Sequence, residues 1–143
     1  MTVKSASAIW NGNLAQGSGT MALGSGAFEG AYTFASRFEN GEGTNPEELI
    51  GAAHAGCFSM ALSHDLAEAG YVPERVATKA DVTLDMVDGV PTITTIKLTC
   101  EAVVASISDE AFQAQVADTK VNCPVSRVLA GADILVEATL TQS

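Results

Sequence analysis

The sequence predicts an α+β fold in which antiparallel strands pack with two main helices, in the order β-β-β-α-β-β-α-β. Stretches with strand-like alternation come in groups joined by short glycine-containing turns, which is typical of hairpins rather than of strands that each alternate with a helix. The chain has 143 residues, of which 47% are hydrophobic and 17% charged. This length and composition predict a single domain over residues 1–143 with one hydrophobic core.

The first forty residues predict a three-stranded β-meander. Partly alternating stretches occupy residues 5–11, 19–23 and 31–38, and glycine-containing turns lie at residues 12–13 and 24–26. Because glycine accommodates the backbone angles of tight turns, we expect the three stretches to pair in sequence order.

A long helix is predicted next, because residues 44–48 are Thr-Asn-Pro-Glu-Glu. This order provides a capping residue, a proline at the first helical position and two acids at the positive end of the helix dipole. We expect the helix to run to Glu68 or Ala69, with Gly70 in the left-handed position that ends it.

The second half predicts a hairpin, a helix and a closing strand. Residues 76–84 and 92–104 alternate and flank Asp88-Gly89, a strong hairpin turn, and residues 134–140 form the last expected strand.

The second main helix is predicted to begin at Ser108, with Phe112, Val116 and Val121 on one face. It breaks at Pro124, which is placed to begin a further short turn of helix.

The charge balance excludes some classes of partner. Seven lysines and arginines against 17 acids give a net charge of −10, which repels nucleic acid and anionic membrane surfaces. No apolar run approaches the length of a membrane span, and the N-terminal residues do not resemble a signal peptide. We therefore expect a cytoplasmic protein with free thiols and no nucleic-acid or membrane partner.

The predicted long helix lacks a polar face. From Leu49 to Leu62 it is apolar or small nearly all round, interrupted by His54 and Ser59. Such a helix has to be covered on every side, which a chain of this length cannot do alone. The sequence therefore predicts an obligate oligomer, most simply a two-fold homodimer.

The three cysteines occupy different predicted environments. Cys57 lies inside the apolar helix, where burial raises the pKa of a thiol and the helix dipole is too distant to help. Cys123 lies at the start of the short helix opened by Pro124, where N–H groups favour a thiolate, and Arg127 could add positive charge. Cys100 alternates with apolar residues and is interpreted as strand core. Each of the first two also has a plain structural interpretation, as a core residue and as a capping residue.

Two other hypotheses concern the scarce polar groups. Arg37, one of three arginines, ends the third predicted strand, where it could be a solvated strand end or a functional cation. A zinc set of Cys57, Cys123, His54 and His64 is conceivable, but its spacing matches no recognised ligand motif. We expect no metal and no cofactor.

Three segments carry a resemblance to a known family. Residues 44–62, TNPEELIGAAHAGCFSMAL, are similar to the signature helix of the OsmC/Ohr family, which comprises osmotically inducible protein C and the organic hydroperoxide resistance proteins. Residues 122–126, NCPVS, resemble its second-cysteine segment, and residues 37–39, RFE, its arginine segment. The PEELIGAAHA core favours the osmotically inducible protein C branch, and the resemblance covers essentially the whole chain.

The resemblance implies an intertwined homodimer of single OsmC-like domains with active sites at the subunit interface. It also implies a thiol-dependent peroxidase that reduces organic hydroperoxides, and hydrogen peroxide less well, in oxidative or osmotic stress defence. Cys57 corresponds to the peroxidatic residue, which becomes a sulfenic acid, and Cys123 to the resolving residue, which forms a Cys57–Cys123 disulfide. Arg37 and Glu47 correspond to the charged pair of the site. An external dithiol, of the lipoyl type in this resemblance, would reduce the disulfide.

A non-catalytic role is the alternative hypothesis. The chain could be a non-catalytic stress protein that binds an apolar ligand at the dimer interface, with incidental thiols. In the peroxidase hypothesis, Phe38, Phe58 and Met60 favour an organic substrate tail, although they are equally suited to a core.

Overall fold

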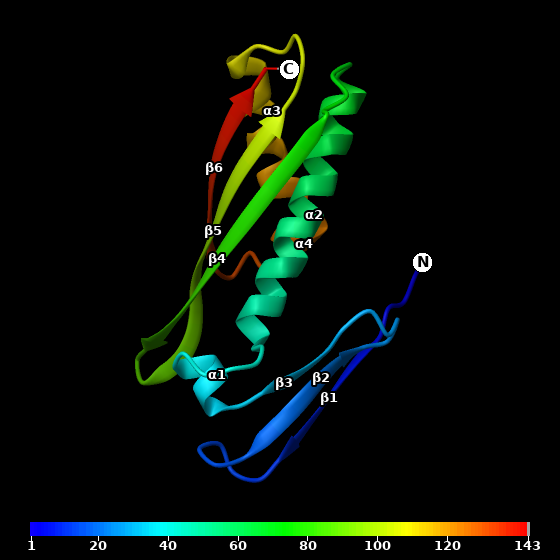
Figure 1. Cartoon of the computed structure of the whole chain (residues 1–143). Helices are drawn as coiled ribbons and strands as arrows, with labels where there is room; N and C mark the ends of the chain where they lie inside the picture. The colour runs from blue at the N-terminus through cyan, green and yellow to red at the C-terminus, as the bar shows by residue number, and fades with distance from the viewer. Residues whose placement is uncertain (143) are drawn as a thin grey trace. The chain divides into compact units, whose positions relative to one another are not determined.

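The computed structural model describes residues 1–142 (Figure 1). The chain forms two compact units, Met1–Leu49 and Ile50–Ser143. The α+β class is confirmed, whereas the prediction of one domain over the whole chain stays a prediction. Within residues 1–142, no helix is both long and apolar enough to cross a bilayer.

The first unit contains the predicted meander. Strands β1 (Ala6–Asn11), β2 (Ser18–Leu23) and β3 (Glu29–Tyr32) pair antiparallel in the order β1-β2-β3. Gly19 of β2 lies opposite both Trp10 and Tyr32, whose ring centroids are 5.1 Å apart. A Cβ at Gly19 would lie 2.7 Å from the Tyr32 ring and 2.8 Å from the Trp10 ring. The glycine therefore allows the two aromatic side chains to meet over the middle strand.

The predicted third strand, residues 31–38, is wrong beyond Tyr32. A short helix, α1 (Phe34–Phe38), begins there and carries Arg37 in its last turn. Thr33 and Ser36 form a capping box, in which the Ser36 N–H donates to Thr33 Oγ1 at 3.1 Å and the Thr33 N–H donates to Ser36 Oγ at 2.8 Å. These reciprocal bonds stabilise the start of the helix, so the local capping chemistry outweighs the apolar alternation that predicted a strand.

The long helix is confirmed as α2 (Pro46–Glu68). Asn45 is its cap, because Asn45 Oδ1 accepts the Glu48 N–H at 2.7 Å. Gly70 has the expected left-handed backbone, with φ of 96°. The first turn of α2 belongs to the first unit and the rest to the second.

The second unit contains a three-stranded sheet in the order β4-β5-β6. Strands β4 (Arg75–Val87) and β5 (Val90–Val103) form the predicted hairpin, and its turn residues Asp88 and Gly89 have φ of 50° and 78°. Both strands are longer than predicted. Strand β6 (Asp133–Thr141) pairs with β5 in parallel, so the expectation of purely antiparallel strands is wrong at this position. The reason is topological, because the intervening helices return the chain to the end of the sheet where β5 began.

The second main helix is confirmed as α3 (Asp109–Asn122), with Ser108 as its N-cap, and α4 (Pro124–Val128) follows it. Phe112 and Val116 are buried as predicted. Val121 is 66% exposed, contrary to expectation. Val121 follows Phe112 by nine residues, and at about 100° per residue this spacing places the two side chains on opposite sides of the helix.

Helices α2 and α3 cover the same face of the second sheet. From Ile96 to Ala102 the side chains of β5 alternate between buried and exposed, and the buried side joins both helices in one core. That core consists of Phe58, Leu62, Leu66, Ile96, Leu98, Cys100, Ala102, Val104, Ile107, Phe112 and Val116.

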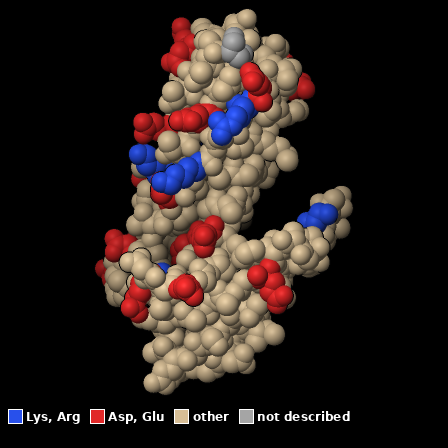
Figure 2. All heavy atoms as spheres, viewed as in Figure 1, with Lys and Arg blue, Asp and Glu red and all other residues tan. Residues whose placement is uncertain are grey.

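Charged groups are spread over the surface of both units. Figure 2 shows acidic side chains scattered among uncharged atoms and outnumbering the lysines and arginines on the face that is drawn. The exposed ion pairs Lys79–Asp81 and Lys97–Glu137 have separations of 3.3 Å and 3.4 Å. Exposed pairs of this kind contribute little to stability.

Candidate functional site

The structure brings Cys57 and Cys123 together. Cys57 is half-buried in the middle of α2, and Cys123 is buried at the N-cap position of α4, with Pro124 as the first helical residue. Both cysteines are free, and their sulfur atoms are 2.9 Å apart. The sequence places them 66 residues apart and does not predict this distance.

The surroundings of the two sulfurs have opposite effects. Burial raises the pKa of Cys57, and its hydrogen bond with Cys123 raises it further, against a smaller lowering by the Val125 N–H. Burial would also raise the pKa of Cys123, but hydrogen bonding from Cys57, the Ser126 N–H and hydroxyl and the Val125 N–H outweighs it and lowers the pKa. When the pair shares one proton, the surroundings within this unit therefore place the negative charge on Cys123.

Hydrogen bonding from Cys57 and from groups at the start of α4, rather than a cation, gives Cys123 this character. The Cys123 side chain makes no capping hydrogen bond, but the nearby Ser126 and Val125 N–H groups stabilise negative charge on its sulfur. Arg127, which the sequence offered as a source of positive charge, is exposed in the last turn of α4.

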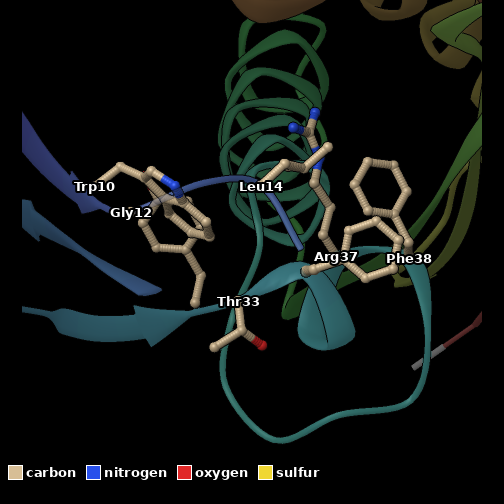
Figure 3. Close-up of a pocket in the computed structure, with 8 residues that line it drawn as sticks. Trp10, Gly12, Leu14, Thr33, Arg37 and Phe38 are labelled. Carbon is tan, nitrogen blue, oxygen red and sulfur yellow. The ribbon is translucent and has the colours of Figure 1, made fainter. Parts of the chain in front are cut away.

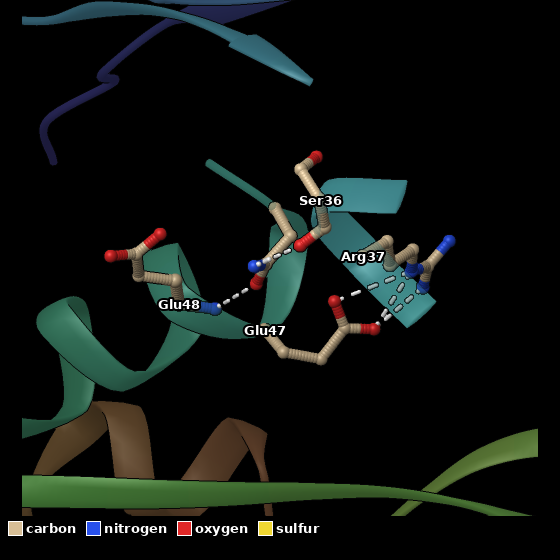
Figure 4. Close-up of polar contacts among 5 residues, drawn as sticks. Ser36, Arg37, Glu47 and Glu48 are labelled. Carbon is tan, nitrogen blue, oxygen red and sulfur yellow. Dashed lines mark hydrogen bonds and ion pairs between the residues drawn. The ribbon is translucent and has the colours of Figure 1, made fainter. Parts of the chain in front are cut away.

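Arg37 and Glu47 form an ion pair in the first unit (Figure 4). Arg37 Nε and Nη2 donate to Glu47 Oε1 at 2.9 Å and 2.8 Å, and Nε also lies 3.3 Å from Oε2. Glu47 is buried, whereas about a third of the Arg37 side chain is exposed. Two donors on one carboxylate fix the orientation of the guanidinium more strictly than a single contact does.

Polar contacts hold α1 against the start of α2, and so position this pair. Ser36 Oγ donates to the Thr44 carbonyl at 2.7 Å, and Asn45 Nδ2 donates to the Ser36 carbonyl at 2.9 Å. Arg37 therefore projects from an ordered helix end rather than from the strand end that the sequence predicted.

The four predicted site residues thus lie in two pairs, one pair in each unit. Cys57 lies with Cys123, and Arg37 lies with Glu47. That both pairs act at one site stays a prediction.

Arg37 also lines a pocket of about 410 Å³ in the first unit (Figure 3). The wall is largely aromatic, and the Arg37 guanidinium carbon lies 5.4 Å from the centre of the Phe38 ring. The lining residues are Trp10, Gly12, Leu14, Tyr32, Thr33, Phe34, Arg37 and Phe38. The pocket thus combines one cation with a surface suited to an apolar group.

The other aromatic and apolar candidates have different places. Phe58 is fully buried and belongs to the core, which favours the core interpretation over a contact with substrate. Met60 is 77% exposed on α2. Cys100 is fully buried in β5, as the sequence predicted.

Sequence reasoning missed one buried contact beside the thiols. His54 Nε2 lies 2.7 Å from Ser126 Oγ, and both side chains are buried. Both residues lie in segments that contain the cysteines, three positions from Cys57 and from Cys123. No pattern in one sequence relates side chains 72 positions apart, and the shared spacing is too common to indicate a contact.

The zinc hypothesis has no geometric support within residues 1–142. Among these residues, no three histidine, cysteine or acidic side chains gather as a metal site requires. His64, one of the four residues of that hypothesis, is exposed.

Two adjacent free thiols on an α+β scaffold, one of them at a helix start, form a candidate dithiol site. Residues 39–138 match the family model described as OsmC-like protein, so this chain belongs to that family and the predicted resemblance is confirmed. Peroxiredoxin OsmC of Escherichia coli (strain K12) is 49% identical over 131 residues, which cover 90% of this chain and 92% of that protein.

Solved structures agree with the fold. An OsmC-like protein from Mycoplasma pneumoniae has a TM-score of 0.76 at 16% identity, with 98% of each chain covered. The organic hydroperoxide resistance protein OhrB of Bacillus subtilis has a TM-score of 0.67 at 24% identity, with 94% of this chain and 98% of that chain covered. At these identities the likeness concerns the fold alone.

Proposed function

We propose that this protein is a thiol-dependent peroxidase that reduces organic hydroperoxides, and hydrogen peroxide less well, through Cys57 and Cys123. The observation that carries the proposal is the 2.9 Å separation of two reduced sulfurs from α2 and α4. Membership of the OsmC-like family and the similarity to a protein named peroxiredoxin support the same activity.

In the first step, the Cys57 thiolate attacks one peroxide oxygen. An S–O bond forms, the O–O bond breaks, and the alkoxide leaves and takes up a proton to become an alcohol. The sulfur loses two electrons and becomes a sulfenic acid, and the peroxide gains them. Because its own unit raises the pKa of Cys57, this step needs a cation, and we assign that role to Arg37.

Glu47 has a positioning role in this proposal. Its two contacts with Arg37 orient the guanidinium, while its own negative charge offsets part of the cation's field. Nη1 of Arg37 has no contact with Glu47 and can donate to a peroxide oxygen.

In the second step, the Cys123 thiolate attacks the Cys57 sulfenic acid. An S–S bond forms, the S–O bond breaks, and hydroxide leaves and takes up a proton to become water. The lowered pKa of Cys123 supports this role, because the attacking sulfur is ionised at neutral pH more often than an ordinary thiol. An external dithiol, of the lipoyl type, then reduces the Cys57–Cys123 disulfide.

The pocket beside Arg37 supports a preference for organic hydroperoxides. Its aromatic wall can remove an apolar substituent from water, which hydrogen peroxide does not have. In this proposal Phe38 and its neighbours contact the substrate tail while Arg37 contacts the peroxide.

We also propose that the protein acts as an intertwined homodimer. One side of α2 is buried in the core of its unit, while Ala52, Ala53, Gly56 and Met60 are exposed on another side. These small and apolar residues form a surface suited to close helix packing against a second copy. Cytoplasmic location and a role in oxidative or osmotic stress defence remain parts of this proposal.

A stoichiometric peroxide titration tests the activity. The reduced protein, treated with one equivalent of an organic hydroperoxide, is expected to lose two of its three thiols and keep Cys100. Mass spectrometry should map the oxidised pair to Cys57 and Cys123. If no thiol is lost quickly, the alternative gains support, in which the protein binds an apolar ligand at the dimer interface without catalysis.

A further inference from the structure

His54 has no role in the proposed reaction, yet it is held in a defined way. Its side chain is fully buried on α2, one turn before Cys57. Nε2 lies 2.7 Å from Ser126 Oγ, and Nδ1 has no hydrogen-bond partner among residues 1–142. Burial lowers the pKa of His54, so the ring is neutral and carries one N–H hydrogen.

The hydrogen bonds determine which nitrogen carries that hydrogen. If it were on Nδ1, a buried N–H group would have no acceptor, which is rare in folded proteins. With the hydrogen on Nε2, the imidazole donates to Ser126 Oγ, and the bare Nδ1 is an unpaired acceptor. The second arrangement pairs the ring's only donor and is therefore favoured.

This arrangement also directs the Ser126 hydroxyl. An oxygen that accepts from His54 keeps its own hydrogen for another acceptor. Ser126 lies in α4, three residues after Cys123, and its hydroxyl is one of the groups that stabilise the Cys123 thiolate. With its oxygen accepting from His54, the Ser126 hydroxyl has its hydrogen free for Cys123 Sγ, and hydrogen bonding from that hydroxyl is among the causes that lower the pKa of Cys123.

We propose that His54 is a positioning residue for the resolving thiolate, because its Nε2–H holds the Ser126 hydroxyl in the orientation that donates to Cys123 Sγ. This inference rests on the proposed function, and it adds two residues, His54 and Ser126, to the second chemical step. The pair does not touch the peroxide. It favours the ionised sulfur that attacks the sulfenic acid.

The Ser126 and Val125 N–H groups also lower the pKa of Cys123, and they remain in every side-chain variant, so the variants isolate the contribution of the hydroxyl. Cys57 on α2 is the titratable group that faces Cys123, and it is consumed as the electrophile in the second step. On α4, Arg127 is exposed. The Thr119 hydroxyl of α3 donates to Asp65 Oδ2 of α2 at 2.6 Å, so this carboxylate already has a hydrogen-bond partner.

The kinetic test separates the two chemical steps. Stopped-flow measurement follows sulfenic acid formation and then disulfide formation in full-length protein, over a range of pH. His54→Leu and Ser126→Ala should leave the first step within about twofold and slow the second about tenfold at neutral pH, the size expected for a hydrogen bond to a charged group. At higher pH both variants should recover the rate of the parent, because Cys123 is then ionised without help.

Two further variants keep the test specific. Glutamine can place an amide N–H where His54 has Nε2–H, so His54→Gln should restore the second step without any titratable ring. His64→Leu removes the exposed histidine of the same helix and should change neither step. A slow second step that does not recover at high pH, or a His54→Gln variant as slow as His54→Leu, would overturn the positioning role.

An equilibrium measurement separates failure of this inference from failure of the proposed function. In a Cys57→Ser/Cys100→Ser background the proposed peroxide chemistry is removed, and the thiolate absorbance reports Cys123 alone. Ser126→Ala and His54→Leu should move that titration to higher pH, and His54→Gln should leave it in place. Unchanged titrations in all three would contradict the inference even if the protein proves to be an active peroxidase.

Discussion

Cys57 and Cys123 touch each other but have different local environments. Cys57 comes from the middle of α2, where burial and its partner thiol raise the pKa. Cys123 lies at the N-cap position of α4, where the hydrogen bond from Cys57, nearby N–H groups and a hydroxyl lower its pKa. The sulfur that the family resemblance assigns to the attack on peroxide is therefore the one that its own unit keeps protonated.

This difference shows what each position contributes to the proposed chemistry. A helix start provides N–H groups that stabilise a thiolate, which suits a resolving residue. A thiol in mid-helix depends on a cation that the local chain does not provide. In the proposed reaction Cys57 is activated by a group outside the second unit, and we assign that role to Arg37, which Glu47 orients.

The largest effect is expected from removing each thiol in turn. Cys57→Ser should abolish peroxide consumption, because no other sulfur is assigned to the first attack. Cys123→Ser should permit one rapid turnover and form no intramolecular disulfide. Rapid-mixing peroxide consumption measures both, and Cys100→Ser is the matched control in the core. Equal loss of the first turnover in both variants would show that the two roles are wrongly assigned.

A smaller effect is expected at the ion pair. Arg37→Ala should lower kcat/KM about a hundredfold, the loss typical of removing one donor to a developing charge. Glu47→Gln should lower it less, because the cation remains but is positioned more loosely. Arg75→Ala, at the beginning of β4, serves as the control arginine. If Arg37→Ala retains full activity, another group must ionise Cys57.

The pocket should affect specificity rather than the chemical step. Phe38→Ala removes part of the aromatic wall and should raise KM for a bulky aromatic hydroperoxide several-fold, with kcat little changed, because the lost contact binds substrate and transition state alike. The kinetics with hydrogen peroxide should stay the same. An equal effect on both substrates would argue against the pocket as the site of the organic substituent.

The smallest effect concerns stability and pH. Burial lowers the pKa of His54 from its ordinary value of 6.5, so at this residue the unfolded chain binds a proton more strongly than the folded protein does. The free energy of unfolding should therefore fall on acidification, with a slope from this group of at most about 1.4 kcal/mol per pH unit. In His54→Gln this contribution should vanish, as urea unfolding at neutral and mildly acidic pH would show. Parallel pH profiles for the two proteins would contradict a buried neutral histidine.

Much of the fold follows from local sequence signals. The TNPEE segment places the start of α2, and Asp88-Gly89 places the hairpin turn, because capping and turn chemistry act over a few residues. The same kind of signal, Thr33 with Ser36, begins α1, but the apolar alternation around it predicted a strand. The parallel pairing of β6 depends on how distant elements pack and has no local signature.

For the candidate site too, local features could be predicted from the sequence and long-range contacts could not. Position at a helix start predicted a lowered pKa for Cys123, and the N–H groups at the start of α4 are among the causes that lower it, after the hydrogen bond from Cys57. The contact of Cys57 with Cys123 and that of His54 with Ser126 join α2 to α4 across long stretches of chain. These contacts depend on tertiary packing, which residue spacing in one sequence does not encode.

The order in which the two thiols ionise tests the central claim most directly. Reduced protein is alkylated with iodoacetamide across a range of pH, and mass spectrometry reports the extent at Cys57 and Cys123 separately. We expect Cys57 to ionise first in the parent protein and Cys123 to ionise first in Arg37→Ala, because only the cation outweighs the local surroundings of Cys57. The same order in both proteins would contradict activation of Cys57 by Arg37.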